Sequence, residues 1–133
     1  MSYDKTIFFL LNRTSNLIER QVNAIFRDCD IEFGSFLMLC AINDSANPGM
    51  NVLAKHLGID PSGLSHVVSR LSRKGFLSKK VGLDKRTIVV KLTAKGRATI
   101  DKYMPLVDNL NKEILANEPA LSSIKHILEL QNA

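Results

Sequence analysis

The sequence predicts a mainly α-helical single domain that carries one small β-hairpin, and three observations lead to this class. The chain has 133 residues, the usual length of one domain with its own core. Apolar residues make up 45% of it and recur at helical spacing along most of its length. Only residues 77–92 alternate around β-branched side chains as strands do. With no run near the ~20 apolar residues of a membrane span and no secretory signal, we expect a cytoplasmic protein without a membrane partner.

Two helices are expected in the first third of the chain. Ile7, Leu11 and Ile18 recur on one face of a long amphipathic helix within residues 4–29. Residues 33–42 are apolar on nearly every side, which is typical of a buried central helix. The first helix therefore lies at the surface and the second lies in the core.

A pair of short helices follows a loop rich in turn-forming residues at 43–49. Asn51 can cap the first helix of the pair, and Gly58 stands where a left-handed helix stop is needed. Asp60 is a strong N-cap, and Pro61 falls at the first helical position, where its missing N–H costs nothing. Two helices joined by such a tight turn indicate a helix-turn-helix.

The second helix of the pair, residues 61–74, buries one stripe formed by Leu64, Val67, Val68 and Leu71. Its other faces carry small and cationic residues that suit entry into the major groove of DNA. We expect the contacts to come from Pro61, Ser62, Gly63, Ser65, His66, Ser69, Arg70 and Arg73. The helix start should also favour a phosphate, because its N–H groups and dipole point outward. A plain helical hairpin with a polar outer face is the alternative.

A basic hairpin comes next. Gly75 ends the helix, and strands are expected at 77–81 and 87–92 around a loop at 82–86. The cations of this wing are Lys79, Lys80, Lys85 and Arg86, with Asp84 among them. The fold class is thus a winged helix-turn-helix.

The C-terminal part is helical again. Thr93 caps a long helical region in which Pro105 should cause a kink or an interruption, and Pro119 precedes a final helix with Leu121, Ile124, Ile127 and Leu128. Several apolar residues exceed what one small core can absorb, namely Leu10, Leu17, Met104, Leu110, Ile124 and Leu128. We therefore expect a homodimer in which residues 4–29 and 94–132 form the dimerisation helices and residues 33–93 form the winged helix-turn-helix of a single domain, 1–133.

The charge distribution points to nucleic acid. Residues 55–102 hold 12 of the 18 Lys and Arg and 3 of the 13 Asp and Glu, a net charge of +9. The remainder, with 6 basic and 10 acidic residues, carries −4. A basic centre between acidic ends is typical of a module that binds double-stranded DNA.

Other classes of protein fit less well. His56, His66 and His126 have no Cys or carboxylate at metal-ligand spacing, and no phosphate loop or nucleophile elbow is present, so we expect no enzyme, cofactor or metal. Cys29 and Cys40 are expected to be free, inert thiols. A redox-responsive regulator and a protein-interaction module that has lost DNA binding stay open as alternatives.

Three segments resemble the multiple-antibiotic-resistance regulator (MarR) family of bacterial winged-helix transcription factors. They are residues 53–60 (LAKHLGID), residues 71–77 (LSRKGFL), and Asp84-Lys85-Arg86 followed by residues 92–96 (LTAKG). The resemblance implies a homodimeric regulator that binds a pseudo-palindromic operator and represses nearby genes. It implies that Arg86 reaches the minor groove, that Asp84 holds the shape of the wing, and that a small aromatic ligand or cysteine oxidation releases the DNA.

Overall fold

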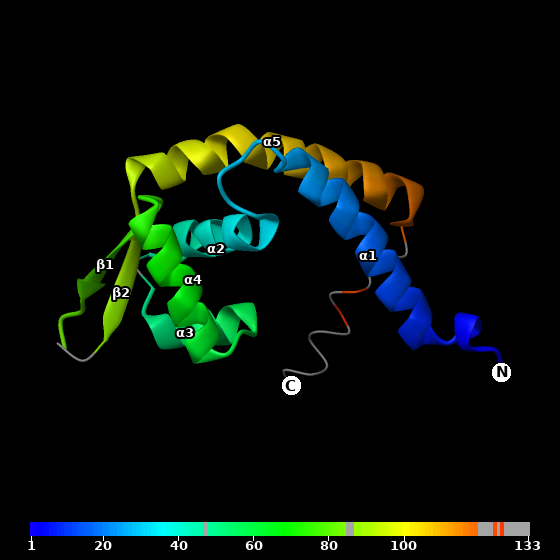
Figure 1. Cartoon of the computed structure of the whole chain (residues 1–133), viewed down its shortest axis with the longest axis horizontal. Coiled ribbons are helices and arrows are strands. Elements are labelled where there is room, and N and C mark those ends of the chain that lie inside the picture. The colour runs from blue at the N-terminus through cyan, green and yellow to red at the C-terminus, as the bar shows by residue number, and fades with distance from the viewer. Residues whose placement is uncertain (47, 85–86, 120–123, 125, 127–133) are drawn as a thin grey trace.

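The computed structural model describes residues 1–46, 48–84, 87–119, 124 and 126. Its elements, in chain order, are η1 (Tyr3–Lys5), α1 (Ile7–Ile25), α2 (Phe33–Asp44), α3 (Met50–Leu57), α4 (Pro61–Arg73), β1 (Leu77–Val81), β2 (Ile88–Leu92) and α5 (Ala94–Asn117) (Figure 1). The mainly helical class with one antiparallel hairpin is confirmed.

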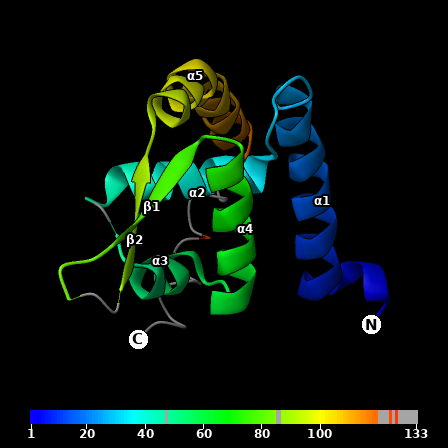
Figure 2. The ribbon, with the colours of Figure 1, turned by 60° about the vertical axis from the view of Figure 1, so that its left-hand side comes forward.

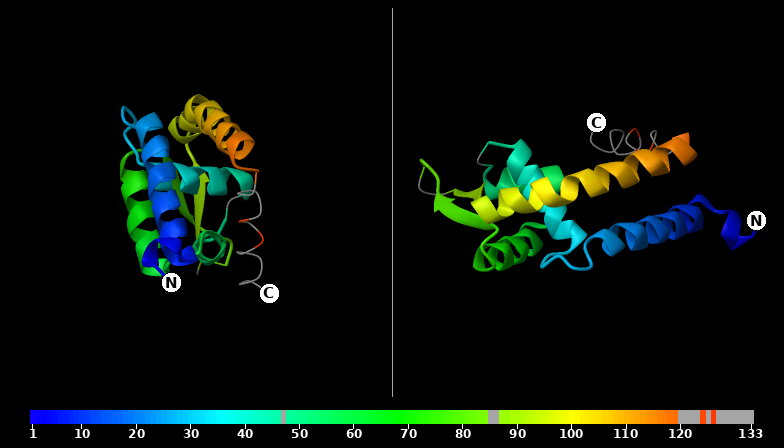
Figure 3. Two further views of the ribbon diagram at one scale, coloured as in Figure 1. Left: turned by 90° about the vertical axis from the view of Figure 1, so that its right-hand side faces the viewer. Right: turned by 90° about the horizontal axis from the view of Figure 1, so that it is seen from above.

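The molecule has a compact part and an elongated part. Helices α2, α3 and α4 and the hairpin gather at one end, while α1 and α5 run side by side away from it (Figure 3). In Figure 2, α1 stands beside the compact part with α4 on the side that faces it. The compact part holds the largest fully buried side chains, which are Phe36, Leu39, Leu53, Leu64, Leu71, Leu77, Val68 and Val90. The core therefore supports the helix-turn-helix.

Helix α2 is the central helix that its apolar sequence predicts. Six of its residues are buried, and Phe36 and Leu39 are completely so. Leu37 is the exception to the predicted burial, because 44% of its surface is exposed.

The turn between α3 and α4 forms as the local signals predict. Gly58 ends α3 at φ 66°, in the left-handed region that favours glycine, and Asp60 caps α4. The predicted cap at Asn51 is wrong, since Gly49 is the N-cap and Asn51 lies inside α3. The reason is tertiary: Gly49 forms a β-bridge with Val89, and this bridge determines where the chain turns into the helix.

Helix α5 is uninterrupted. Of the two outcomes expected at Pro105, a kink or an interruption, the interruption does not occur. The helix runs from Ala94 to Asn117 with Pro105 inside it, and it packs against α1, α2 and β2 (Figure 1). These contacts hold the helix together although proline removes one backbone hydrogen bond. Of the predicted final helix, Ile124 and His126 are helical, whereas Leu121, Ile127 and Leu128 lie outside the described residues. Among the described residues, no helix combines the length and apolarity that crossing a membrane requires.

Candidate nucleic-acid interface

Helix α4 presents outward the face that its sequence predicts. Leu64, Val68 and Leu71 are completely buried beneath it. The exposed residues of the predicted interface are Pro61, Ser62, Ser65, His66, Arg70 and Arg73, and the half-buried ones are Gly63 and Ser69. An outer face of small and cationic side chains can approach DNA closely, because no bulky apolar group stands in the way.

The start of α4 is closed by its own cap. The Asp60 carboxylate accepts a hydrogen bond from the Ser62 N–H at 3.1 Å and a second, short one from the Ser62 hydroxyl. These hydrogen bonds hold the pKa of Asp60 below its usual range, so the cap is ionised at neutral pH. The Ser62 hydroxyl therefore donates its hydrogen bond to the Asp60 cap, within the protein itself.

The other end of α4 is fastened to the connection between α1 and α2. One Arg70 guanidinium nitrogen donates to Ser35 Oγ at 3.3 Å and lies 3.9 Å from a Glu32 carboxylate oxygen. Lys74 Nζ donates to the Asp30 carbonyl at 2.8 Å and lies 3.8 Å from the Asp30 carboxylate. Arg70 thus belongs to the flank of α4 that meets α2, and His66 and Arg73 carry the outer face.

The hairpin stands on the opposite flank of α4. Its register pairs Leu77 with Leu92 and Val81 with Ile88. Lys79 Nζ donates to Ser69 Oγ at 3.2 Å, which links the wing to α4. Lys80 is exposed on the same strand. The predicted wing residues Lys85 and Arg86 lie outside the described residues.

Asp84 shapes the loop of the wing. Its carboxylate accepts hydrogen bonds from the Thr87 N–H at 3.0 Å and from the Thr87 hydroxyl at 2.8 Å. This bridge spans the turn between the strands and shows how an aspartate here can define the loop's shape.

Sequence reasoning missed several exposed residues of the wing. Lys91 is a further exposed cation on β2, and the alternation of Val90, Lys91 and Leu92 is the signal that could have revealed it. Leu83 and Val81 expose apolar surface at the far end of the hairpin, for which the sequence offered no signal.

A cavity of about 830 Å³ lies between α1, the α1–α2 connection and the end of α4. Two aromatic residues, Phe26 and Phe33, belong to its lining, and their ring centroids are 5.7 Å apart. Behind the lining, the buried ring of Phe26 stacks on Tyr103 at 5.0 Å. The sequence did not reveal this cavity, because its walls come from three separate segments. Arg70 and Lys74 both line it, so the cavity adjoins the candidate recognition helix.

Both cysteines are free thiols, as expected. Burial, with a smaller contribution from the charge of Asp44, raises the pKa of Cys40 to about 11, so this thiol stays protonated at neutral pH. Cys29 lines the cavity. In the part of the chain that the structure describes, no group of three or more His, Cys, Asp or Glu residues could hold a metal ion.

Comparison with known proteins gives a consistent set of relatives, although no protein-family model matches the chain. The multiple antibiotic resistance protein MarR of Escherichia coli K12 is 28% identical over 124 residues, covering 90% of this chain and 86% of its own. The HTH-type transcriptional repressor NicR of Pseudomonas putida KT2440 is 27% identical over 118 residues, which cover 82% of this chain and 74% of NicR.

Solved structures agree with the sequence comparison. Bordetella bronchiseptica BpsR, whose DNA binding is regulated by 6-hydroxynicotinic acid, superposes with a TM-score of 0.86 at 20% identity, covering 99% of this chain and 96% of its own. Staphylococcus aureus MepR, solved in complex with DNA, superposes with a TM-score of 0.84 at 17% identity. The superposition covers 98% of this chain and 99% of the MepR chain. This chain is therefore similar in sequence to regulators of the MarR family, and it has the fold of these winged helix-turn-helix transcriptional regulators.

Proposed function

We propose that this protein is a homodimeric transcriptional regulator that binds double-stranded DNA in a sequence-specific manner and represses nearby genes. The observation that carries the proposal is the exposed polar and cationic face of α4 beside a basic wing. Residues 55–102, which include both elements, carry a net charge of +9. Such a charge supplies the sequence-independent attraction to phosphates on which base recognition builds.

Each part of this surface has a different role in the proposal. Helix α4 enters the major groove, where His66 and Arg73 contact base edges. Lys79, Lys80 and Lys85 neutralise phosphates, and Arg86, by resemblance to the family, enters the minor groove. Arg70 acts mainly by fixing the angle of α4, since Ser35 and Glu32 already engage its guanidinium.

A fluorescence-anisotropy series tests these roles with duplexes from the region upstream of the gene and with random duplexes, across salt concentrations. Arg73→Ala should cost about 1–3 kcal/mol at one operator position and little on random DNA. Lys80→Ala should weaken both duplexes alike and reduce the salt slope by about 0.9. Lys5→Ala, at the far end of the chain, is the matched control. Equal losses on all duplexes for Arg73→Ala and Lys80→Ala would refute base reading by α4.

The dimer part of the proposal rests on exposed apolar surface. On α1, Phe8 is 81% and Leu10 46% exposed, and on α5 Leu106 is 47% exposed. Patches of this kind on a monomer are rare unless a partner covers them. A two-fold dimer built on α1 and α5 matches a pseudo-palindromic operator whose half-sites lie about one helical turn apart.

We also propose that a small aromatic effector regulates DNA binding by occupying the cavity beside α4. Its aromatic lining supports this, as does the regulation of BpsR by 6-hydroxynicotinic acid. A regulator of this kind acts in the cytoplasm and needs no catalytic activity, which agrees with the regulatory names of its relatives.

A further inference from the structure

The far end of the wing exposes apolar side chains that the fold does not use. Leu83, in the loop, is completely exposed, and the last residue pair of the two strands, Val81 and Ile88, is 68% and 46% exposed. Single apolar residues are common on protein surfaces, but three together at the end of one hairpin form a patch. Such a patch indicates a surface that a partner covers.

The loop holds Leu83 at its apex. The Gly82 N–H donates a hydrogen bond to the Thr87 carbonyl at 2.6 Å, and the Asp84 carboxylate accepts one from the Thr87 N–H at 3.0 Å. Both neighbours of Leu83 are therefore tied to the same residue across the turn. A side chain presented by a loop of this kind loses little conformational entropy when it enters a partner.

The surroundings of the patch are cationic. Residues 77–92 contain five Lys or Arg and one acidic residue, Asp84, so the hairpin carries a net charge of +4. Lys80 and Lys91 are exposed, and together with Leu83 they line a hollow of about 600 Å³ on the hairpin. The partner that fits must combine negative charge outside with apolar surface inside. Double-stranded DNA has both, because phosphates surround its stacked bases.

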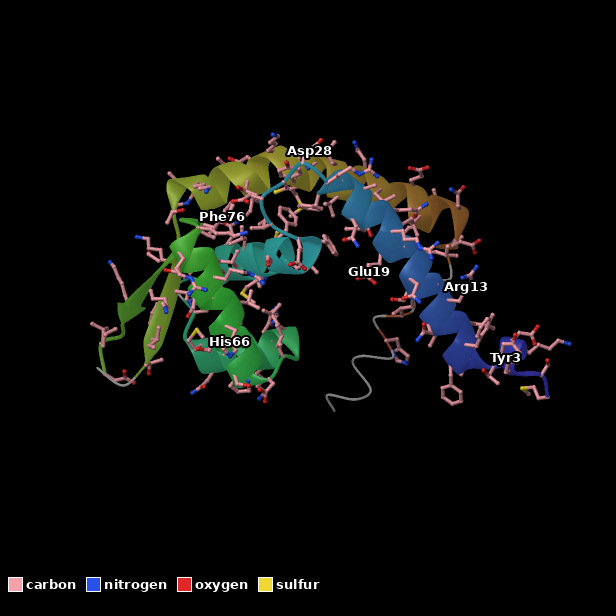
Figure 4. The ribbon with its side chains drawn as sticks, in the orientation of Figure 1. Tyr3, Arg13, Glu19, Asp28, His66 and Phe76 are labelled. Carbon is pink, nitrogen blue, oxygen red and sulfur yellow. The ribbon has the colours of Figure 1, made fainter. Side chains whose placement is uncertain are left out.

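The position of the tip relative to α4 determines which part of a duplex it meets. In Figure 4, His66 lies on the part of α4 that is remote from α5, and the hairpin extends toward the same side of the molecule. Lys79 is bonded to Ser69 at the flank of α4, and Leu83 follows four residues later, up to about 13 Å further at ~3.3 Å per residue. With α4 in a major groove about 12 Å wide, this reach takes the tip across the groove edge to the adjacent minor groove.

The proposed dimer leaves the tip accessible. The hairpin lies at the end of the molecule opposite the start of α1 (Figure 1). A second copy that packs on α1 and α5 therefore does not cover Leu83, and a bound duplex can.

We propose that Leu83 is an apolar wedge that inserts between two base pairs from the minor groove and kinks the DNA. The inference rests on the proposed function, because it requires a duplex held by α4. Leucine is one of the side chains that architectural proteins insert in this way, and each insertion unstacks a base step and bends the duplex by about 20–90° toward the major groove. Here α4 occupies the major groove, so the bend closes the duplex around the helix.

A wedge selects DNA by its deformability. Pyrimidine–purine steps such as TA unstack easily, whereas A-tracts are stiff and have a narrow minor groove that attracts Arg and Lys. A duplex of alternating T and A and a duplex with all its adenines on one strand have the same composition and differ in this property. Insertion of Leu83 favours the alternating duplex, whereas a purely electrostatic contact favours the A-tract.

Fluorescence anisotropy with the full chain compares these two duplexes, each closed by a loop that keeps its strands in register. The parent protein should bind the alternating duplex about five- to tenfold more tightly, because the stiff steps cost more to unstack. Leu83→Ala should reduce this ratio to less than about twofold, and Leu83→Met, which keeps a long apolar side chain, should preserve it. Leu37→Ala is the matched control, an exposed leucine on α2 whose replacement should leave the ratio unchanged.

The kink itself is measured by energy transfer between fluorophores at the two ends of a duplex from the region upstream of the gene, at saturating protein. Binding of the parent protein and of Leu83→Met should raise the transfer, and binding of Leu83→Ala should raise it much less. Lys80→Ala should weaken binding and reduce the salt slope but keep the rise at saturation, because it removes a phosphate contact and not the wedge. Since Leu83 is completely exposed, its variants should melt at the temperature of the parent protein.

Three results would overturn the wedge and leave the proposed function intact: equal or tighter binding of the A-tract by the parent protein, no rise in energy transfer on binding, or the same ratio and rise with Leu83→Ala. A changed oligomeric state of Leu83→Ala in sedimentation velocity, with unchanged bending, would assign the patch to a protein contact and also overturn it. A parent protein that binds none of the duplexes would refute the proposed function, and the wedge with it.

Discussion

Gly96, in the first turn of α5, lies against Phe76 just beyond the end of α4, and replacing it with alanine should destabilise the protein. The Phe76 carbonyl accepts a hydrogen bond from the Thr93 N–H at 3.2 Å, which draws the first turn of α5 against the end of α4. A Cβ atom on Gly96 would lie 2.2 Å from that carbonyl oxygen and 3.2 Å from Leu92 Cδ2. Real Cβ atoms do not approach closer than 3.0 Å, so the backbone would have to move by at least 0.8 Å.

Overpacking that shifts backbone costs about 1–3 kcal/mol. Weakening the Thr93–Phe76 hydrogen bond adds about 0.5–1.5 kcal/mol, and the better helix propensity of alanine returns up to about 1 kcal/mol. We therefore expect Gly96→Ala to lower the free energy of unfolding by about 0.5–4.5 kcal/mol.

The assay is urea denaturation followed by far-UV circular dichroism at one fixed protein concentration, because dimerisation makes stability depend on concentration. Gly34→Ala is the matched control: it also lies in a helix, and a Cβ there meets nothing within 4 Å. The control should be neutral or stabilising by up to about 1 kcal/mol. If both variants unfold at the same urea concentration as the parent protein, the close approach to Phe76 does not explain the glycine.

Three further outcomes are expected. Leu64→Ala should lower the free energy of unfolding by about 2–5 kcal/mol, because Leu64 is completely buried, whereas Val52→Ala on the exposed side of α3 should stay within about 0.5 kcal/mol in the same assay. Leu10→Asp combined with Leu17→Asp should yield monomers in sedimentation velocity, and a persistent dimer would contradict the dimer surface proposed for α1. In a Cys29→Ser variant, alkylation of Cys40 by iodoacetamide should accelerate about tenfold per pH unit from pH 7 to pH 10, since its pKa is about 11, and a plateau near pH 8.5 would contradict that pKa.

The helix-turn-helix could be predicted from the sequence because its signals are local. Gly58 ends one helix, Asp60 and Pro61 start the next, and Leu64, Val68 and Leu71 mark the buried stripe within a few residues of each other. Each signal depends on backbone dihedrals or helical spacing, which neighbouring residues determine.

The features that the sequence did not predict depend on distant contacts. The cap of α3 moved to Gly49 because Val89, forty residues later, pairs with it. Helix α5 continues through Pro105 because it packs along α1 and α2. The cavity was not predicted either, since its walls combine α1, the α1–α2 connection and α4. None of these can be inferred from spacing along one segment.

Arg70 shows what helical periodicity can predict about function and what it cannot. Periodicity correctly separates Arg70 from the buried stripe, but the surface outside the stripe has three different surroundings. One flank of α4 meets α2 through Arg70 and Ser35, and the other meets the wing through Ser69 and Lys79. Between these flanks lies the surface that no described element covers, and His66 is exposed there. Residues of equal exposure on one helix therefore divide into those that hold the helix and those free to contact DNA, and this division follows from the fold and not from the sequence pattern.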